Sequence, residues 1–387
     1  MSIIHLAFTG DIICSKTHDK LCEKNNYAPV FEKVTGILKD NDYIIGSLET
    51  TFSGPEAKYT NTSQSFNTPD SFASCLKQVG FDLLTTASNH CLDRGVAGLE
   101  RTINILEKQG LDHTGTFYKR DKAKYLIKEI KSLKFAFISC TYGTNSASNG
   151  FILSEDEEYH VNLTKKQDPY FVPNAKVKLF RFIRRLLPDF INNKLRPPKV
   201  VEDCVSELQI SNPDNKRYID GITTVIEEAK AKADIVIVCL HSGGQYNLST
   251  GKYTNFLFEL FAKHGADVII GNHTHSILPI QRIGSCIVFC SLGNFIYDPR
   301  ELPSPPDTQS EYSVLPRLGF DVEEKKLKSI EYSVCKTIIN NSGLAVVCPV
   351  DDLNDFEEDL EKINNRLTGK SNKSKYNDNY FSCDLDC

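Results

Sequence analysis

Short apolar runs alternate with amphipathic patterns along most of the chain. The runs are three to six residues long and rich in β-branched and aromatic side chains, as is typical of buried strands. They cover 3–8, 43–45, 81–85, 135–139, 235–240, 268–270 and 287–289. Between them, Leu99, Ile103 and Leu106 follow the spacing of one helix face, and similar patterns recur over 72–79, 222–231 and 255–263. This alternation predicts an α/β fold with its chemistry in loops beyond strand ends.

The alternation lapses over about 142–220, a stretch too long for an ordinary connection, and we interpret it as an insertion into a first domain over 1–349. Basic and apolar residues interleave within it. The basic ones are Lys176, Lys178, Arg181, Arg184, Arg185, Lys194, Arg196 and Lys199. We favour a surface helix that packs its apolar face on the main domain. The alternative is a basic amphipathic helix, within 176–199, that contacts an anionic membrane surface or a partner.

A second amphipathic pattern lies near the C-terminus, in an acidic stretch. Its apolar positions are Leu353, Phe356, Leu360, Ile363 and Leu367. They predict a docked helix over 350–367 with its charges in solvent, and a dimer-forming helix is the less favoured alternative. Residues 368–387 are rich in Lys, Ser and Asn and have little to bury, so we expect a disordered tail.

Composition places the chain among ordinary globular proteins, with 387 residues, 40% hydrophobic and 25% charged. The net charge of −5 argues against specific or general nucleic-acid binding by the whole protein. Several of the 13 cysteines lie inside apolar runs, which favours reduced thiols over a disulfide framework. With neither a basic leader at the N-terminus nor an apolar run of 18 residues, we expect a cytoplasmic protein.

Five strand-end loops carry potential metal ligands. The candidates are Asp11, Glu49, Asn89 with His90, His241, and the pair His273 and His275. Each has a simpler explanation when taken alone: a turn former, a surface carboxylate, a helix cap or a packed core histidine. Because each follows an apolar run, one sheet edge could collect all of them. Carboxylates and imidazoles suit manganese, iron or zinc, and a bridging carboxylate can hold two such ions roughly 3.5–4 Å apart.

Several segments, in this order along the chain, resemble the bacterial poly-γ-glutamate capsule biosynthesis (CapA-type) family, a branch of the calcineurin-like metallophosphoesterases. They are Phe8–Asp11, Ser47–Thr50, Gly80–Asp82, Ser88–Gly95, Gly265–Val268, His273–His275 and Ser291–Phe295. The resemblance runs from Ile3 to about Tyr297, interrupted by the insertion. It implies a four-layer α/β/β/α sandwich of two facing sheets, with a metal site at their loop edge.

The resemblance also implies roles for the candidate residues. Asp11 and His275 would bind one divalent ion, Glu49 would bridge two, and the second ion would take the remaining ligands, which are Asn89, His241 and His273. His90 would be the catalytic group that protonates the leaving oxygen or steadies the transition-state charge. Asp93 would orient His90 or the start of the following helix.

The sequence departs from the family pattern at three places. General metallophosphoesterases carry a histidine where this chain has Ile13, so a site for one ion is an alternative to a site for two. The family's His-Trp-Gly and following Glu are replaced by His241-Ser242-Gly243-Gly244-Gln245. Asn67 stands where the family often has an arginine, which removes a candidate phosphate or carboxylate clamp.

Within Ser291–Phe295, we expect Ser291 and Asn294 to hydrogen-bond the ligand loops and Phe295 to pack between the sheets. A tight turn that closes the sheet edge is an equally simple interpretation.

The function predicted is that of a metal-dependent hydrolase, in which a metal-bound hydroxide cleaves a phosphoester in a small molecule or polymer. One alternative is a non-catalytic component of capsule or poly-γ-glutamate assembly. Another is hydrolysis of a γ-glutamyl amide at the same site. The sequence contains neither Gly-x-Gly-x-x-Gly after its first strand nor a P-loop motif, which argues against dinucleotide and ATP binding.

Overall fold

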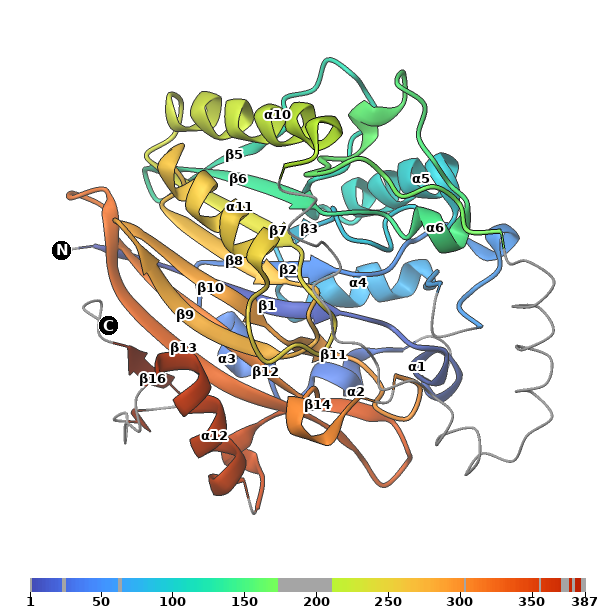
Figure 1. Cartoon of the computed structure of the whole chain (residues 1–387). Helices are drawn as coiled ribbons and strands as arrows, with labels where there is room; N and C mark the ends of the chain where they lie inside the picture. The colour runs from blue at the N-terminus through green and yellow to red at the C-terminus, as the bar shows by residue number, and fades with distance from the viewer. Residues whose placement is uncertain are drawn as a thin grey trace.

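The computed structural model describes residues 2–22, 26–61, 65–172, 211–302, 304–354, 356–369, 376–377 and 380–383. Within these ranges the chain forms two β-sheets with helices on their outer faces (Figure 1). The basic segment 176–199 lies outside the described residues, so its predicted helix and its membrane or partner contact stay predictions.

The first sheet has the order β15-β16-β13-β12-β1-β2-β3-β4. Its strands are β1 (Ile3–Ile12), β2 (Tyr43–Leu48), β3 (Leu83–Thr85), β4 (Asp112–Thr114), β12 (Tyr312–Asp321), β13 (Lys326–Ile339), β15 (Tyr376–Asn377) and β16 (Tyr380–Cys383), with β11 (Asn294–Ile296) beside β1 and β14 (Ala345–Pro349) beside β13. β1 to β4 are parallel neighbours. Their carboxyl ends therefore meet at one edge of the sheet.

The second sheet has the order β5-β6-β7-β8-β10-β9. Its strands are β5 (Leu126–Ile130), β6 (Leu133–Thr141), β7 (Ile235–His241), β8 (Val268–Asn272), β9 (Ile277–Ile283) and β10 (Cys286–Leu292). β6, β7, β8 and β10 are parallel, and their central residues are continuously buried, as expected for strands covered on both faces.

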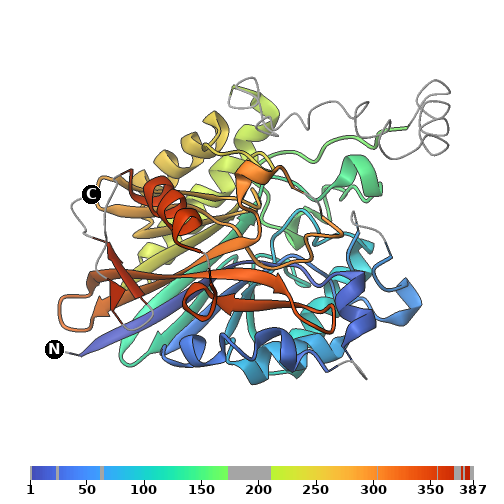
Figure 2. The same ribbon diagram turned by 90° about the horizontal axis from the view of Figure 1, so that it is seen from below.

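Helices cover the outer face of each sheet, and Figure 2 shows these layers from a second direction. On the first sheet lie α2 (Ala28–Phe31), α3 (Thr35–Lys39) and α4 (Asp70–Val79), and on the second α10 (Pro213–Lys230) and α11 (Lys252–Lys263). The other elements are α1 (Lys16–Leu21), α5 (Gly95–Lys108), α6 (Ser146–Asn149), α12 (Glu357–Thr368) and short 3₁₀ turns at Pro55–Ala57, Glu158–His160, Pro306–Thr308 and Val350–Asp352.

Alternate residues of the central strands fill two different cores. Leu6 and Phe8 of β1 point between the sheets, where they share a cluster with Phe137 and Ile237 of the second sheet. Ala7 of β1 instead belongs to the cluster beneath the outer helices. This alternation follows from the period of two in a β-strand. The α/β class and the four-layer α/β/β/α sandwich predicted from the sequence are therefore confirmed.

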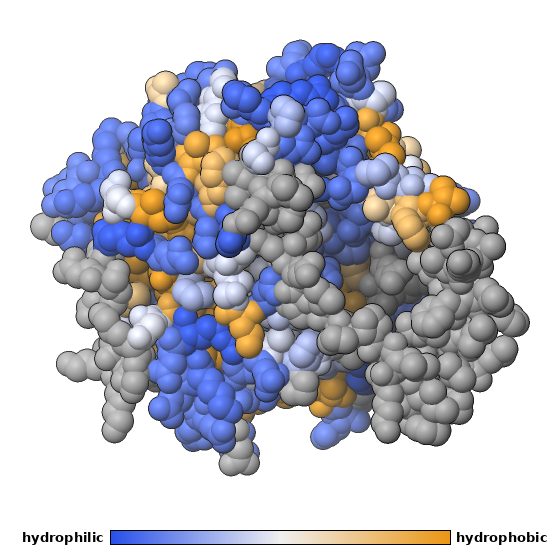
Figure 3. All heavy atoms as spheres, in the orientation of Figure 1, coloured by the Kyte–Doolittle hydropathy of each residue, from blue (hydrophilic) through white to orange (hydrophobic). Residues whose placement is uncertain are grey.

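The C-terminal part extends this sandwich. In place of one helix over 350–367, a 3₁₀ turn at Val350–Asp352 precedes α12, whose buried face joins the core between the sheets. Figure 3 shows the hydrophilic outer surface of this helix. The expectation of a disordered tail fails at Tyr380–Cys383, which pairs with β13 and stacks Phe381 on Tyr332, with ring centroids 5.4 Å apart. The polar composition of the tail obscured the signal from Tyr380 and Phe381, which are buried.

Phe295 does not pack between the sheets as expected. Its ring lies 6.3 Å from that of Phe31 and 6.1 Å from that of Phe81, in the core between the first sheet and its helices. β11 pairs with β1 and so belongs to the first sheet, which turns Phe295 to that outer face.

All the described cysteines except Cys383 are buried free thiols, as the sequence predicts. None of the helices in the described ranges combines the length and the apolar composition needed to cross a bilayer.

His18 makes the stability of the fold sensitive to acid. It is buried, with Nδ1 2.8 Å from Ser15 Oγ and Nε2 3.2 Å from the carbonyl oxygen of Ala345, and burial lowers its pKa to about 4. Between about pH 6.5 and 4, the His18 side chain is therefore protonated in the unfolded chain but neutral in the native protein. The free energy of unfolding falls as the pH falls through this range.

We expect the wild type to lose about 1 kcal/mol more unfolding free energy than His18→Gln between pH 7.5 and 5.5. Urea unfolding of the metal-free proteins at the two pH values measures this difference. Lys20→Gln, an exposed change in the same helix, should follow the wild type. Equal losses in wild type and His18→Gln would contradict the assignment.

Candidate metal centre

The two sheets bring the candidate ligands together at one edge. Asp11 lies near the end of β1, and Glu49 follows β2 directly. His241 ends β7, and His273 and His275 lie in the turn after β8. All five side chains are buried. The first sheet thus supplies the carboxylates and the second sheet the imidazoles.

These side chains form two ligand sets with one member in common. Glu49, His241 and His273 each offer one ligand atom within 4.8 Å of the others, and so do Asp11, Glu49 and His275. A carboxylate shared by two sets is what a bridge between two ions requires.

Asn89 joins the set that contains His241. Its Oδ1 lies 2.8 Å from His241 Nε2, and His273 Nδ1 lies 3.2 Å from the same nitrogen. The structure therefore gathers all six residues for which the sequence predicts a metal-binding role, and the binding role itself stays a prediction.

Three of the donor atoms fit a cation because they are buried without a hydrogen-bond partner. Both carboxylate oxygens of Glu49 and Nδ1 of His241 are buried without a hydrogen bond. The imidazole nitrogens nearest to Glu49 Oε1 are Nε2 of His241 at 3.7 Å and Nε2 of His90 at 3.8 Å, beyond hydrogen-bond distance. Leaving a carboxylate buried in this way costs several kcal/mol unless a positive charge compensates it.

The protonation equilibria show the same need for positive charge. Burial raises the pKa of Asp11 to about 7, although hydrogen bonds from the His273 N–H and Ser47 act in the opposite direction. Burial and the neighbouring Asp11 raise the pKa of Glu49 well above its usual value. Burial also lowers the pKa of His241 and His273, which keeps these imidazoles neutral, the form that binds metals. A divalent ion would reverse the carboxyl shifts, so its binding should release protons.

Further contacts orient the ligands. Ser47 Oγ donates to Asp11 Oδ1 at 2.9 Å, and the His273 N–H donates to Asp11 Oδ2 at 2.9 Å. Asn294 Oδ1 accepts from His275 Nδ1 at 2.8 Å, while Thr274 Oγ1 donates to Ser291 Oγ at 2.8 Å. Asn294 and Ser291 therefore hold the ligand turn, as the sequence predicts.

The ligand turn adopts unusual backbone conformations. His273 has a φ of 95° and His275 a φ of 56°, a region that residues other than glycine rarely occupy. Two such residues in one turn indicate that the surrounding contacts impose the geometry of the ligands.

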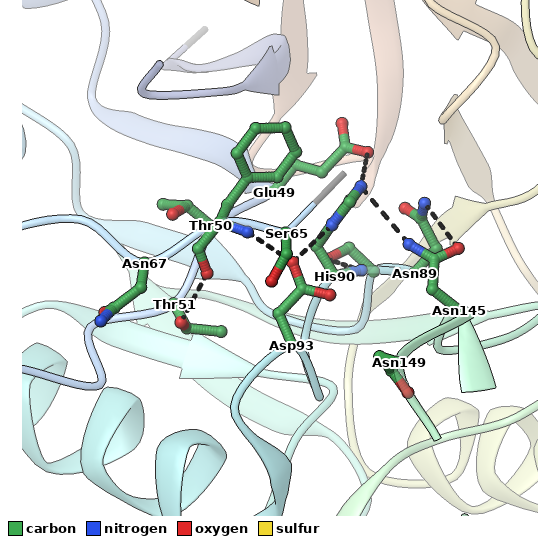
Figure 4. A network of polar contacts seen from close by, with 12 residues as sticks. Glu49, Thr50, Thr51, Ser65, Asn67, Asn89, His90, Asp93, Asn145 and Asn149 are labelled. Carbon is green, nitrogen blue, oxygen red and sulfur yellow. Dashed lines mark hydrogen bonds and ion pairs between the residues drawn. The ribbon is translucent and has the colours of Figure 1, made fainter. Parts of the chain in front are cut away.

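His90 faces the ligands from the loop before α5 (Figure 4). Its Nδ1–H donates to Asp93 Oδ2 at 2.7 Å, and the same oxygen accepts from the Phe66 N–H at 2.6 Å. The Phe66 ring lies 4.4 Å from the imidazole, between centroids. Asp93 and Phe66 thus fix the ring so that Nε2 points toward Glu49, where it can exchange a proton with a reacting group.

Two departures from the family pattern have a structural explanation. Ile13 packs with Phe66 and Tyr297 in a small apolar cluster, so an apolar contact stands where the general family has a histidine ligand. Asn67 is buried, accepts from the Ser53 N–H at 2.7 Å and donates to the carbonyl oxygen of Gly54 at 2.8 Å. Asn67 therefore shapes its own loop and is not free to bind substrate.

The sequence analysis missed several residues around the site. The Tyr142 ring lies 4.7 Å from that of His273, and the Tyr246 ring 5.6 Å from that of His275, between centroids. Asn145 contacts both Asn89 and His90. Tyr142 and Asn145 follow the end of β6, so the strand-end argument that found the ligands applies to them too. Placing the start of the insertion at Tyr142 obscured this.

Replacing Asn294 by alanine should lower metal affinity by about 10- to 100-fold, because His275 loses the contact that orients it. Isothermal titration of the metal-free variant with Mn²⁺ measures the change. Ser276→Ala is the matched control, since the Ser276 hydroxyl is buried beside His275 without a hydrogen-bond partner. Equal affinities for Asn294→Ala and Ser276→Ala would contradict the orienting role.

The sequence of this chain is similar to those of bacterial capsule proteins. The profile described as "Bacterial capsule synthesis protein PGA_cap" matches residues 5–299. The "PGA biosynthesis protein CapA" of Bacillus subtilis (strain 168) is 26% identical over 301 residues, which cover 76% of this chain and 64% of that protein. The "Capsule biosynthesis protein CapA" of Bacillus anthracis is 24% identical over 296 residues, which cover 76% of this chain and 59% of that protein.

A solved structure described as a novel phosphatase from Mycoplasma pneumoniae aligns over 92% of this chain and 99% of its own, with a TM-score of 0.41 and 14% sequence identity. A hypothetical protein from Thermus thermophilus aligns over 86% of this chain and 99% of its own, with the same TM-score and identity.

Proposed function

Because this chain belongs to the family of bacterial capsule synthesis proteins designated PGA_cap, as its sequence predicts, we propose that it is a metal-dependent hydrolase that cleaves a phosphoester. The observation that carries the proposal is the unpartnered Glu49 carboxylate, buried where two sets of candidate ligands meet. Bound divalent ions would supply positive charge to a phosphoryl group and lower the pKa of a water molecule.

The protein's own residues would bind the ions, orient the ligands and supply a proton. Glu49, which both ligand sets share, and Asp11, which belongs to one set, would supply negative charge to bound ions, and Asn294 holds His275 in orientation. His90, which Asp93 fixes at Nδ1, presents Nε2 on the side of Glu49. This nitrogen would give a proton to the leaving oxygen.

A second candidate, cleavage of a γ-glutamyl amide at the same site, is favoured by the name of the Bacillus subtilis relative, a PGA biosynthesis protein. The alignment spans 64% of that protein, and 59% of the Bacillus anthracis one. Because these alignments are partial, we treat a γ-glutamyl substrate for this chain only as a candidate.

The test is hydrolysis by the chelated protein after reconstitution with Mn²⁺, Fe²⁺ or Zn²⁺, with metal content per chain measured by plasma mass spectrometry. Substrates are bis-p-nitrophenyl phosphate, p-nitrophenyl phosphate and γ-glutamyl-p-nitroanilide. Metal-dependent release from a phosphate substrate would support the proposal, and release from the anilide alone would support the second candidate. Stoichiometric metal without either activity would instead favour a non-catalytic role in assembly.

A further inference from the structure

Asn145 reaches the candidate metal centre from the loop that follows β6 (Figure 4). Its Oδ1 accepts a hydrogen bond from Asn89 Nδ2 at 3.3 Å, and its Nδ2 lies 3.4 Å from His90 Nε2. One amide therefore touches both a candidate ligand and the candidate proton donor. It comes from the second sheet, whereas Asn89 and His90 come from the loop after β3 of the first.

The Asn145 side chain makes these contacts and does not cap α6. Asn145 occupies the N-cap position of α6, and asparagine is among the residues preferred there because its side chain can bond the first backbone N–H groups. In this helix the side chain makes no capping hydrogen bond. The side-chain amide is therefore available for the contacts with Asn89 and His90.

The backbone holds Asn145 in this position. Its φ of 54° and ψ of 25° are left-handed, a conformation that asparagine, aspartate and glycine tolerate better than other residues. Its carbonyl oxygen accepts from the N–H groups of Ser148 at 2.8 Å and Asn149 at 2.9 Å. The Asn149 side chain donates to the carbonyl oxygen of Thr144 at 2.8 Å. Hydrogen bonds therefore fix the backbone at Thr144 and at Asn145, which limits the positions that the Asn145 amide can reach.

The contact with Asn145 favours one of the two orientations of the Asn89 amide. An asparagine can present either its oxygen or its NH₂ group, but only the oxygen can bind a cation. Because Asn145 Oδ1 accepts from Asn89 Nδ2, Asn89 Oδ1 is turned toward His241 Nε2, 2.8 Å away. The reverse orientation would direct an NH₂ group at the candidate ion position.

We propose that Asn145 is a positioning residue that keeps the Asn89 amide in its metal-binding orientation and so raises the affinity of the Asn89, His241 and His273 set for a divalent ion. The inference rests on the proposed function, because it assumes that these residues bind metal. It adds a residue of the second sheet, from the first turn of the expected insertion, to those that control the site.

Two substitutions separate the parts of the Asn145 side chain. Asn145→Gly removes the amide but permits the left-handed backbone, and Asn145→Asp keeps an oxygen to accept from Asn89 while removing the NH₂ group near His90. The probe is Co²⁺, titrated into the chelated full-length protein, with visible absorption and plasma mass spectrometry as readouts. We expect Asn145→Gly to bind the Co²⁺ of the Asn89, His241 and His273 set about 10- to 100-fold less tightly than wild type. Asn145→Asp should keep at least the wild-type affinity.

The outcomes distinguish this inference from the function on which it rests. Wild type that binds no Co²⁺ would overturn both. Wild type that binds Co²⁺ with the same affinity as Asn145→Gly would overturn the positioning role alone, as would equal losses in Asn145→Gly and Asn145→Asp. Circular dichroism and thermal melting in EDTA check that both variants fold.

Discussion

Glu49→Gln is expected to abolish metal-dependent hydrolysis while making the metal-free protein more stable. The variant loses the carboxylate common to both ligand sets, so the rate should fall by about 10³-fold or more, since charge stabilisation by the ions is worth several kcal/mol. Without metal, the same carboxyl group is buried with no hydrogen bond to either oxygen. Its replacement by a neutral amide should therefore raise the unfolding free energy by about 1–2 kcal/mol.

The pH dependence of this stabilisation follows from the raised pKa of Glu49. A carboxyl group whose pKa is raised on folding favours the native state below its unfolded pKa, and that contribution is lost as the pH rises through the folded value. The advantage of Glu49→Gln in EDTA should therefore grow as the pH rises from about 4.3 toward neutrality.

Urea unfolding with and without Mn²⁺, together with metal content, measures both effects of Glu49→Gln. Glu56→Gln removes an exposed carboxylate and should change stability by no more than about 0.5 kcal/mol. A Glu49→Gln protein that keeps wild-type metal content and rate would refute the bridging role.

His90→Gln should separate catalysis from metal binding. Nε2 of His90 lies 3.8 Å from Glu49 Oε1, and the ring is fixed by Asp93, but His90 belongs to neither ligand set. Loss of a general acid lowers kcat by about 10²- to 10⁴-fold. Metal content should stay at the wild-type level.

Single-turnover hydrolysis and plasma mass spectrometry check the two parts of this prediction for His90→Gln. His264→Gln serves as a control, since His264 follows α11 and pairs with Glu227 at the surface. Metal loss in His90→Gln would mean that the residue is a ligand. Unchanged hydrolysis with metal retained would show that His90 is not the general acid.

The convergence of the ligands could be predicted because it depends on a simple property of parallel strands. Asp11, Glu49 and His241 each follow or end an apolar run, and runs joined by helices become parallel strands whose carboxyl ends share an edge. The number of sheets and their facing arrangement came from the family resemblance. The residues of an apolar run do not indicate which of the two sheets the strand will join.

The C-terminal extension of the first sheet could not be found by searching for apolar runs. β13 alternates exposed or partly buried with buried positions near its start, because one side of it faces solvent. Such a strand has a period of two and not a continuous apolar core.

Helix positions were predicted well at their centres, since 72–79 lies within α4 and 255–263 within α11. Their polar first turns lie outside the apolar pattern.

The contact between Asp11 and His273 constrains when the site can form during synthesis. The two residues are separated by 262 positions in sequence, although the His273 N–H donates directly to Asp11. At about 5–20 residues per second, His273 is added roughly 13 to 50 seconds after Asp11. Until then β1 and β2 lack β8 and the histidine turn, and the Glu49 carboxylate stays open to water. The centre is therefore a late product of translation, and metal loading can begin only when most of the chain has emerged.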